Sequence, residues 1–361
     1  MQALIIGVDL GLPDYLAQRE EFDMLAKGAG AVVAGQLTAR RDRPDAAYFI
    51  GSGKADEIAL MVEETEADIV LFDQPLSPAQ QRNLERKFNV RVVDRVALIL
   101  DIFALRAKSH EGKLQVELAQ LQHLATRLTR MWSHLERQRG GIGMRGPGES
   151  QLEMDRRMIG DKVKVLKERL SRLQRQRVTQ RRARARGASI SISLVGYTNA
   201  GKSTLFNALT HADAYAADQL FATLDTTTRK LWVEGTGQVT ISDTVGFIRD
   251  LPHTLIAAFR ATLEEAIHAD VLFHVVDASS DQRDEQIHQV QRVLLDIGAG
   301  EVPQVMVYNK IDNLGLPARI ERDAHGTIQK IFVSAQQREG LNFIRQAIAE
   351  FALSAETHAI H

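Results

Sequence analysis

Cysteine is absent from this chain of 361 residues. Its absence excludes disulfide bonds and every zinc site built on Cys thiolates. Long apolar runs are also absent: stretches such as ASISISLVG are far shorter than the roughly 20 residues of a membrane-spanning helix, so we expect no membrane partner. The beginning of the chain, MQALIIGVDLGLPDYL, lacks the basic and long apolar segments of a signal peptide, which predicts a cytoplasmic protein.

Two kinds of catalytic site are missing as well. The 11 histidines show no H-E-x-x-H or other metal-ligand spacing, and no Ser-His-Asp or Cys-His set is evident. The string SHEGK around His110 predicts the capped start of a helix rather than a catalytic group. Zinc chemistry and covalent nucleophilic catalysis therefore have no support.

The near-zero net charge of −1 hides an asymmetry. Residues 187–361 carry 13 Lys and Arg against 21 Asp and Glu, whereas residues 1–186 carry 32 against 25. Such a difference indicates that the first half meets a polyanion, although an unevenly solvated surface would give the same numbers.

Residues 1–110 alternate short apolar runs with helical patterns, which predicts a small α/β domain with a mostly parallel sheet. The apolar runs are ALIIGVDL, AVVAGQL, AYFIG and ADIVLFD. A helix is expected to begin after Ser77, because serine is a good N-cap and Pro78 suits the first helical position.

Residues 111–186 predict a long antiparallel helical hairpin. Apolar residues recur at spacings of three and four, and form two seams: Leu114, Leu118, Leu121, Ala125, Leu128, Trp132 and Leu135, then Ile159, Val163, Leu166, Leu170 and Leu173. Between the seams lies a glycine-rich loop at 137–150, which is costly to order without an external contact. From Arg172 to Arg186 there are seven arginines and no acidic residue.

The stretch SISLVGYTNAGKSTLFNAL contains an apolar strand, a G-x-x-x-x-G-K-S turn and a helix, the arrangement of a P-loop. Backbone N–H groups of the turn would cradle phosphates, Lys202 would reach the β- and γ-phosphates, and the Ser203 hydroxyl would bind Mg²⁺. The residues expected around the phosphates are Gly196, Tyr197, Thr198, Asn199, Ala200, Gly201, Lys202, Ser203 and Thr204. Residues 187–361 are thus predicted to be a P-loop GTPase domain, a mostly parallel sheet with flanking helices.

Further motifs follow in the order a GTPase requires. ISDTVG ends a strand with Asp243, suited to hold Mg²⁺, and Gly246 can donate its N–H to the γ-phosphate; Thr244 and Val245 lie between them. In VMVYNKID, the Asp312 carboxylate can accept two N–H groups of guanine that adenine lacks. The residues expected around the base are Asn309, Lys310, Ile311, Asp312, Ser334, Ala335 and Gln336.

Between the P-loop and Asp243, the threonine-rich stretch FATLDTTTRKLWV predicts a switch segment. One threonine hydroxyl should complete the Mg²⁺ shell when GTP is bound. We favour Thr223, in the segment Phe221, Ala222, Thr223, Leu224 and Asp225, while Thr226, Thr227 and Thr228 are alternatives. The predicted catalytic set is Lys202, Thr223 and Gly246, and the predicted metal set is Ser203, Thr223 and Asp243.

Several strings together resemble the HflX family of translation-associated GTPases over nearly the whole chain: YFIGSGKADEI, GGIGMRGPGESQLEMDRR, FATLD, DTVGFIRDLPH, AFRATLEEA and NKID. The resemblance implies a GTPase that binds the large (50S) ribosomal subunit through its N-terminal region and helps to dissociate stalled or idle ribosomes, or acts in ribosome biogenesis or protein synthesis. It assigns the phosphate, Mg²⁺ and guanine roles to Gly196–Ser203, Thr223, Asp243–Gly246, Asn309, Lys310, Asp312 and Ser334. Many bacterial members continue into a further C-terminal domain, which this chain, ending at His361, does not include.

The expected ligands are GTP or GDP with Mg²⁺, and the expected partner of a monomeric chain is ribosomal RNA. Arginines around the glycine-rich loop are the predicted RNA contacts: Arg137, Arg139, Arg145, Arg156 and Arg157. One alternative uses GSGK, Gly51–Lys54, as half of a phosphate loop and makes the N-terminal half an ATP-driven RNA remodelling module regulated by the GTPase domain. Another alternative is an interaction protein in which the hairpin joins two chains.

Overall fold

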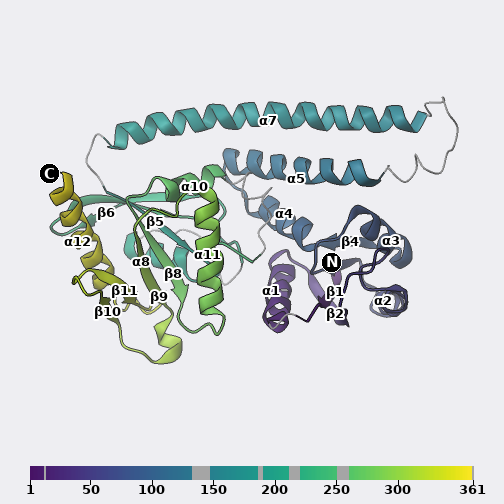
Figure 1. Ribbon diagram of the computed structural model, residues 1–361, viewed down its shortest axis with the longest axis horizontal. Helices are drawn as coiled ribbons and strands as arrows, with labels where there is room; N and C mark the ends of the chain where they lie inside the picture. Colours follow the sequence, from purple (N-terminus) through teal and green to yellow (C-terminus); the bar gives the residue numbers. More distant parts are fainter. Residues whose placement is uncertain (12–13, 132–146, 186–189, 211–219, 250–259, 360–361) are drawn as a thin grey trace. The chain divides into compact units, whose positions relative to one another are not determined.

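The computed structural model describes residues 1–11, 14–131, 147–185, 190–210, 220–249 and 260–359. The chain divides into two compact units, residues 1–105 with 113–171 and residues 106–112 with 172–361 (Figure 1). Residues 137–146 of the predicted glycine-rich loop, with Arg137, Arg139 and Arg145, lie outside the described residues, whereas residues 147–150 belong to a helix, so the predicted end of the loop at 150 is wrong. Of the helices in the described ranges, none combines the length and apolar character needed to cross a membrane.

The first unit contains a parallel sheet of four strands in the order β2-β1-β3-β4, as the strand–helix alternation predicts. Its elements are β1 (Gln2–Asp9), α1 (Tyr15–Gly28), β2 (Val32–Arg40), α2 (Ser52–Glu64), β3 (Ile69–Phe72), α3 (Pro78–Phe88), β4 (Arg91–Asp94) and α4 (Arg95–Arg106). The expected start of α3 is confirmed: Ser77 and Gln80 form a capping box, and Pro78 occupies the first turn.

One predicted strand of this unit is wrong. The run AYFIG does not enter the sheet: Phe49, with φ 69°, closes a turn by a two-residue bridge to Asp45. Phe49, at 8% exposure against Phe72, and Ile50 are nevertheless buried, which explains why the run is apolar without being a strand. Residues 91–106, where β4 and α4 lie, carry no strand or helix signal strong enough to predict either element.

Helices α5 (His110–Met131) and α7 (Pro147–Ala185) correspond to the predicted hairpin, and the chain direction reverses between them (Figure 1). Burial follows the predicted seams: along residues 159–171 of α7, the half-buried or buried positions are Ile159, Val163, Leu166 and Leu170, and their neighbours are exposed. The apolar period of the sequence is therefore the buried stripe of the helix.

The second unit contains a sheet of seven strands in the order β10-β11-β9-β8-β5-β7-β6. Pairs β6–β7 and β10–β11 are antiparallel and the others are parallel. Its elements are β5 (Ser191–Gly196), α8 (Lys202–Thr210), β6 (Thr227–Val233), β7 (Gly237–Asp243), α10 (Arg260–Ile267), β8 (Val271–Asp277), α11 (Arg283–Ile297), β9 (Gln304–Asn309), η1 (Ile311–Leu314), β10 (Arg319–Arg322), β11 (Ile328–Phe332) and α12 (Leu341–Ala359).

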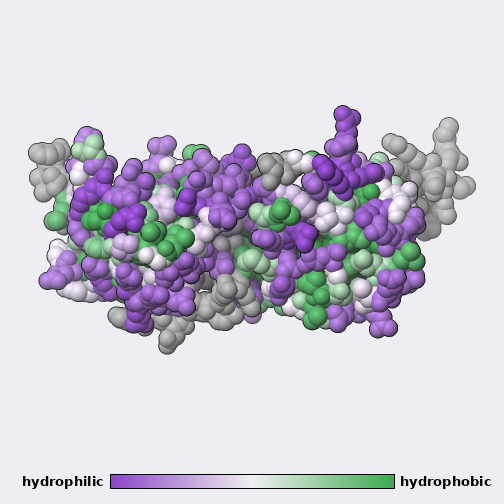
Figure 2. All heavy atoms as spheres, turned by 90° about the horizontal axis from the view of Figure 1, so that it is seen from below, coloured by the Kyte–Doolittle hydropathy of each residue, from purple (hydrophilic) through white to green (hydrophobic). Residues whose placement is uncertain are grey.

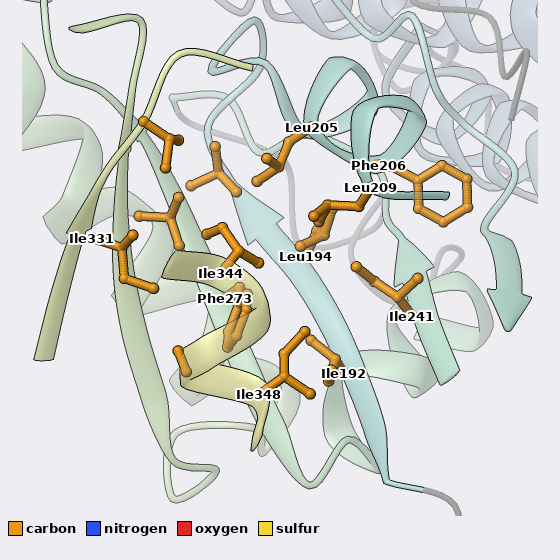
Figure 3. Close-up of a cluster of buried hydrophobic side chains, with 14 of the residues drawn as sticks. Ile192, Leu194, Leu205, Phe206, Leu209, Ile241, Phe273, Ile331, Ile344 and Ile348 are labelled. Carbon is orange, nitrogen blue, oxygen red and sulfur yellow. The ribbon is translucent and has the colours of Figure 1, made fainter. Parts of the chain in front are cut away.

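The core of this unit joins the central strands to two helices (Figure 3). Ile192 and Leu194 of β5 and Phe273 of β8 meet Phe206 of α8 and Ile344 of α12, all nearly inaccessible to solvent. Because packed apolar side chains fix the strand ends against α8, the loops between them are held in place. On the face in Figure 2, hydrophilic side chains predominate and hydrophobic ones form scattered patches.

Candidate functional site

Four strands of the second unit end at one edge of the sheet. β5 pairs in parallel with β7 and β8, and β8 pairs in parallel with β9. Their last residues are Gly196, Asp243, Asp277 and Asn309. In open α/β sheets, ligands bind beyond the carboxyl ends of the strands, so these termini mark the candidate nucleotide site.

The P-loop needs backbone conformations that glycine adopts most easily. Gly196 and Gly201 have φ of 148° and 90°, and Asn199 has φ of 60°. A Cβ at Gly196 would lie 2.2 Å from the Val275 carbonyl oxygen, and one at Gly201 would lie 2.2 Å from Asn309 Nδ2. Both glycines are therefore required by close approach as well as by φ.

A hollow faces the N-terminus of α8. It is lined by Thr198, Asn199, Gly201, Lys202, Ser203, Thr204, Phe221, Ala222, Thr223, Thr244 and Gly246, all predicted from the motifs. Lys202 Nζ donates to the Gly196 and Tyr197 carbonyl oxygens at 3.1 and 2.8 Å. Burial lowers the pKa of Lys202 to about 8, against the opposing effect of the Asp243 carboxylate. A phosphate in the hollow would favour the charged ammonium.

Three predicted metal ligands converge beside the hollow. Ser203 Oγ lies 2.7 Å from Thr223 Oγ1 and donates to Asp243 Oδ2 at 2.6 Å, and Thr223 Oγ1 also donates to that oxygen, at 3.1 Å. Burial raises the pKa of Asp243, whose Oδ1 is buried without a hydrogen-bond partner. An oxygen-only donor set with an uncompensated carboxylate fits a hard cation such as Mg²⁺.

Of the candidate threonines, the structure brings Thr223 to this corner. Thr228, on β6, lies 3.0 Å from Ser242 Oγ instead. The hydroxyl of Thr223 thus lies beside Ser203 and Asp243, as expected of the switch threonine.

The segment that follows β7, residues 244–249, lies directly against the P-loop. Phe247 donates its N–H to the Gly196 carbonyl oxygen at 3.1 Å and accepts from the Thr198 N–H at 2.7 Å. The Tyr197 hydroxyl accepts from the Arg249 N–H at 2.7 Å. The Phe247 ring is 1% exposed, so it belongs to the core rather than to the hollow.

The predicted base-binding residues surround one buried amide. Asn309 Nδ2 donates to the Ala200 carbonyl oxygen at 3.0 Å, and its Oδ1 accepts from the Ala335 N–H at 2.9 Å. Asp312 Oδ1 is buried without a hydrogen-bond partner. An unpaired buried carboxylate oxygen is costly, which suits a group that receives N–H donors from a ligand.

Other predicted residues lie elsewhere. The side chains of Leu224, Val245 and Ile311 are buried in the core, so only their backbone can reach a nucleotide, and Gln336 is exposed. Asp225 does not line the hollow; its carboxylate accepts from the N–H groups of Lys108 and Ser109.

Two contacts near the site have little or no signal in the sequence. Asp277 at the end of β8 pairs with Lys310 at 2.8 Å, between Nζ and Oδ2. The contact between Ser109 and Asp225 joins positions 116 residues apart. The only sequence signal for Asp277 is its place at a strand end, and the Ser109 contact has none, since tertiary structure alone brings these residues together. The cap expected near His110 is confirmed, because Ser109 Oγ accepts from the Gly112 N–H at 2.8 Å.

A second hollow lies in the first unit, at the end of β2 and the start of α2. Its lining residues are Thr38, Ala39, Arg40, Arg41, Ile50, Gly51, Ser52, Gly53 and Lys54. Gly51 has φ 85°, and a Cβ there would lie 2.4 Å from Arg41 Nη2. Lys54 pairs with Glu57 at 2.9 Å.

Three family models match consecutive parts of the chain: a GTP-binding GTPase N-terminal region over 17–104, a GTP-binding GTPase middle region over 106–184, and a 50S ribosome-binding GTPase over 191–310. Among solved structures, a GTP-binding protein from the archaeon Sulfolobus solfataricus in complex with GDP has a TM-score of 0.51 at 24% identity, and covers 98% of this chain and 100% of its own. That likeness shows a shared fold.

Curated relatives are much closer in sequence. The chain is 51% identical to the GTPase HflX of Escherichia coli strain K12, over 97% of this chain and 82% of that protein. It is 46% identical to the GTPase HflX of Caldanaerobacter subterraneus subsp. tengcongensis, over 99% of this chain and 82% of that protein. These matches span all the site elements described above, and the chain belongs to the HflX family of GTPases, enzymes that bind and hydrolyse GTP.

Proposed function

We propose that this GTPase couples a Mg²⁺-dependent GTP cycle to binding of the large (50S) ribosomal subunit through its basic N-terminal half. In this cycle it helps to dissociate stalled or idle ribosomes. Convergence of the Ser203, Thr223 and Asp243 oxygens within 3.1 Å is the observation that carries the nucleotide part. Thr223 would complete the Mg²⁺ shell with GTP and leave it after hydrolysis, so the nucleotide would set the switch segment.

In the proposed chemistry, the P-loop amides and Lys202 bind the phosphates, Ser203, Thr223 and Asp243 hold Mg²⁺, and Gly246 donates its N–H to the γ-phosphate. The cation would neutralise charge that develops on the phosphate oxygens. Asn309, with Ser334 and Ala335, shapes the base pocket, and Asp312 accepts the guanine N–H groups.

The ribosomal partner is supported by charge and by the family model matched to the GTPase domain. Basic side chains are exposed along α7: Arg156, Arg157, Lys162, Lys164, Lys167 and Arg169. Such a helix attracts phosphates through counterion release, without sequence preference. We further expect a cytoplasmic monomer.

Sedimentation through sucrose gradients tests the proposal. The chain is mixed with 30S, 50S or 70S particles in the presence of a non-hydrolysable GTP analogue or GDP. We expect it to travel with 50S particles in the analogue and to be released in GDP. Equal binding in both nucleotides, or binding to no particle, would contradict the proposal.

The hollow at Gly51–Lys54 supports a second candidate, an ATP-driven RNA remodelling activity of the N-terminal half. It combines a helix N-terminus with the Arg41 guanidinium, an arrangement that attracts phosphate. In the full chain, this activity predicts an ATPase that survives Lys202→Ala and disappears in Lys54→Ala. ATP hydrolysis that is lost with Lys202→Ala would assign it to the GTPase site.

A further inference from the structure

The start of helix α5 is held by the switch segment of the GTPase unit. Asp225 lies two residues after Thr223, and its carboxylate accepts from the N–H groups of Lys108 and Ser109, both at 2.8 Å, and from the Ser109 hydroxyl. Ser109 Oγ in turn accepts from the Gly112 N–H at 2.8 Å. All these residues belong to the second unit, although Lys108–Gly112 precede the P-loop by more than eighty positions.

Gly112 shows how closely Asp225 approaches the helix. A Cβ at this position would lie 2.2 Å from Asp225 Oδ1 and 3.0 Å from Ser109 Oγ. Glycine is, after proline, the poorest residue for a helix interior, yet it occupies the first turn of α5. The contact with Asp225 explains it, since any other residue would displace the carboxylate.

The switch segment is fixed at a second point at the same time. The Thr223 hydroxyl forms hydrogen bonds with Ser203 and Asp243, the other two predicted metal ligands. Leu224, which lies between Thr223 and Asp225, is buried, with 2% of its surface exposed. A segment this short cannot lose its hold at Asp225 without freeing the Thr223 hydroxyl to move. The two contacts therefore stabilise each other.

We propose that residues 108–112 anchor the switch segment within the same chain: Ser109 and Gly112 hold Asp225, which places the Thr223 hydroxyl beside Ser203 and Asp243, where Mg²⁺ would bind. The three are positioning residues, because their effect passes through Thr223. The proposal rests on the proposed role of Thr223 as a Mg²⁺ ligand. Since coupling is reciprocal, GTP that engages Thr223 also tightens the hold on the start of α5, which continues covalently to Met131.

The anchor should discriminate between nucleotides. GTP with Mg²⁺ recruits the switch threonine, whereas GDP leaves it free. Breaking the anchor should therefore weaken a non-hydrolysable GTP analogue about five- to twentyfold, a typical coupling between sites, and leave GDP affinity unchanged. The KM for GTP should rise by a similar factor, because KM follows the dissociation constant when hydrolysis is slow, and kcat should fall because the Thr223 hydroxyl is less well oriented.

The full-length chain carries the test, with Gly112→Ala as the principal variant. Alanine favours the helix, so α5 is not weakened, but its Cβ displaces Asp225. Ser109→Ala and Asp225→Ala remove the hydroxyl and the carboxylate. The matched control is Ser77→Ala, which deletes the serine cap of α3 in the other unit. Affinities for fluorescent GDP and GTP analogue are measured for each with Mg²⁺ present.

We expect the analogue-to-GDP affinity ratio to fall in the three anchor variants, to fall no further when Gly112→Ala and Asp225→Ala are combined, and to stay unchanged in Ser77→Ala. Hydrogen exchange of the Ser109 and Gly112 amides should be slower with the analogue than with GDP in the wild type. If Thr223→Ala lowers the analogue-to-GDP affinity ratio but Gly112→Ala leaves it unchanged, the proposed anchor is wrong and the proposed role of Thr223 stands. An unchanged ratio in Thr223→Ala would instead overturn the role of Thr223 and the proposed metal site.

Discussion

Asp312 is the residue on which base selection depends in the proposed site. Its Oδ1 is buried without a partner, and the guanine donors would satisfy it. Asp312→Asn should weaken GTP by roughly ten- to hundredfold, because a lost hydrogen bond to a charged group costs about 1.5–3 kcal/mol, and should improve binding of xanthosine triphosphate. Titration with fluorescent nucleotides measures both effects. GTP affinity equal to that of Asp281→Asn, a change at an exposed carboxylate, would contradict the assignment.

Phe247 occupies the position after Gly246, where many GTPases place a glutamine that orients the attacking water. The ring is buried and cannot form that hydrogen bond. We expect slow intrinsic hydrolysis, on the order of 10⁻⁴ to 10⁻² per second, that increases when 50S particles order the switches. Phosphate release with and without the subunit checks this; a fast rate that 50S particles leave unchanged would be inconsistent with it.

We expect His274 to make the stability of the GTPase unit sensitive to acid. Burial first, and the Lys202 charge second, lower the pKa of His274 to about 4 from its usual 6.5. Between these values the unfolded chain binds a proton that the folded chain does not, so the free energy of unfolding should fall as the pH drops from 6.5 towards 4, by roughly 3 kcal/mol at most. In urea unfolding, His274→Leu should flatten this pH dependence and His288→Leu, at an exposed histidine, should keep it. Equal slopes in wild type and His274→Leu would refute the assignment.

Residues in local motifs could be predicted from the sequence, and residues joined by tertiary contacts could not. Lys202, Ser203 and Asp243 stand in strings whose chemistry is fixed by spacing, and the structure brings them together. The partner of Asp225 has no such string, because the distance between Ser109 and Asp225 along the chain is set only by folding.

Helix α7 is the element that we propose to contact ribosomal RNA. Its Arg156 and Arg157 are exposed, next to the predicted RNA-contact loop. Replacing both with Ala should weaken 50S binding and reduce the slope of log affinity against log salt by about 1.5, while GTP affinity stays unchanged. Replacing both with Lys keeps the charge and should keep the slope. Binding across a salt series measures it, and an unchanged slope in the Ala variant would show that these arginines meet no phosphate.

The long helices were predictable because their apolar period is strong, and the buried positions Ile159, Val163 and Leu166 follow it. Short strands were harder to predict from the sequence. AYFIG has the composition of a strand, but Phe49 adopts a positive φ that ends any extended run, and only the fold shows this. β4 has four residues, too few for a period to stand out.

At the scale of the whole molecule, the charge asymmetry predicts that the two halves have different roles: the basic half binds RNA and the acidic half binds nucleotide. The division of the chain into three domains stays a prediction. When the chain is divided into compact units, residues 106–112 and the end of α7 belong to the same unit as the GTPase domain. The charge composition of the sequence changes near residue 187, but the compact unit that contains the GTPase domain also includes residues before that position.

In the proposed cycle, the nucleotide held by Asp312 controls binding to the 50S subunit. The most direct test of this control is sedimentation of the Asp312→Asn variant with 50S particles in a non-hydrolysable analogue of either GTP or xanthosine triphosphate. We predict that the xanthosine analogue restores binding at concentrations where the guanosine analogue does not, with the opposite preference in the wild type. Two results would contradict the account. In one, the variant binds 50S particles equally well with either analogue. In the other, it binds xanthosine nucleotide but does not bind 50S particles with either analogue.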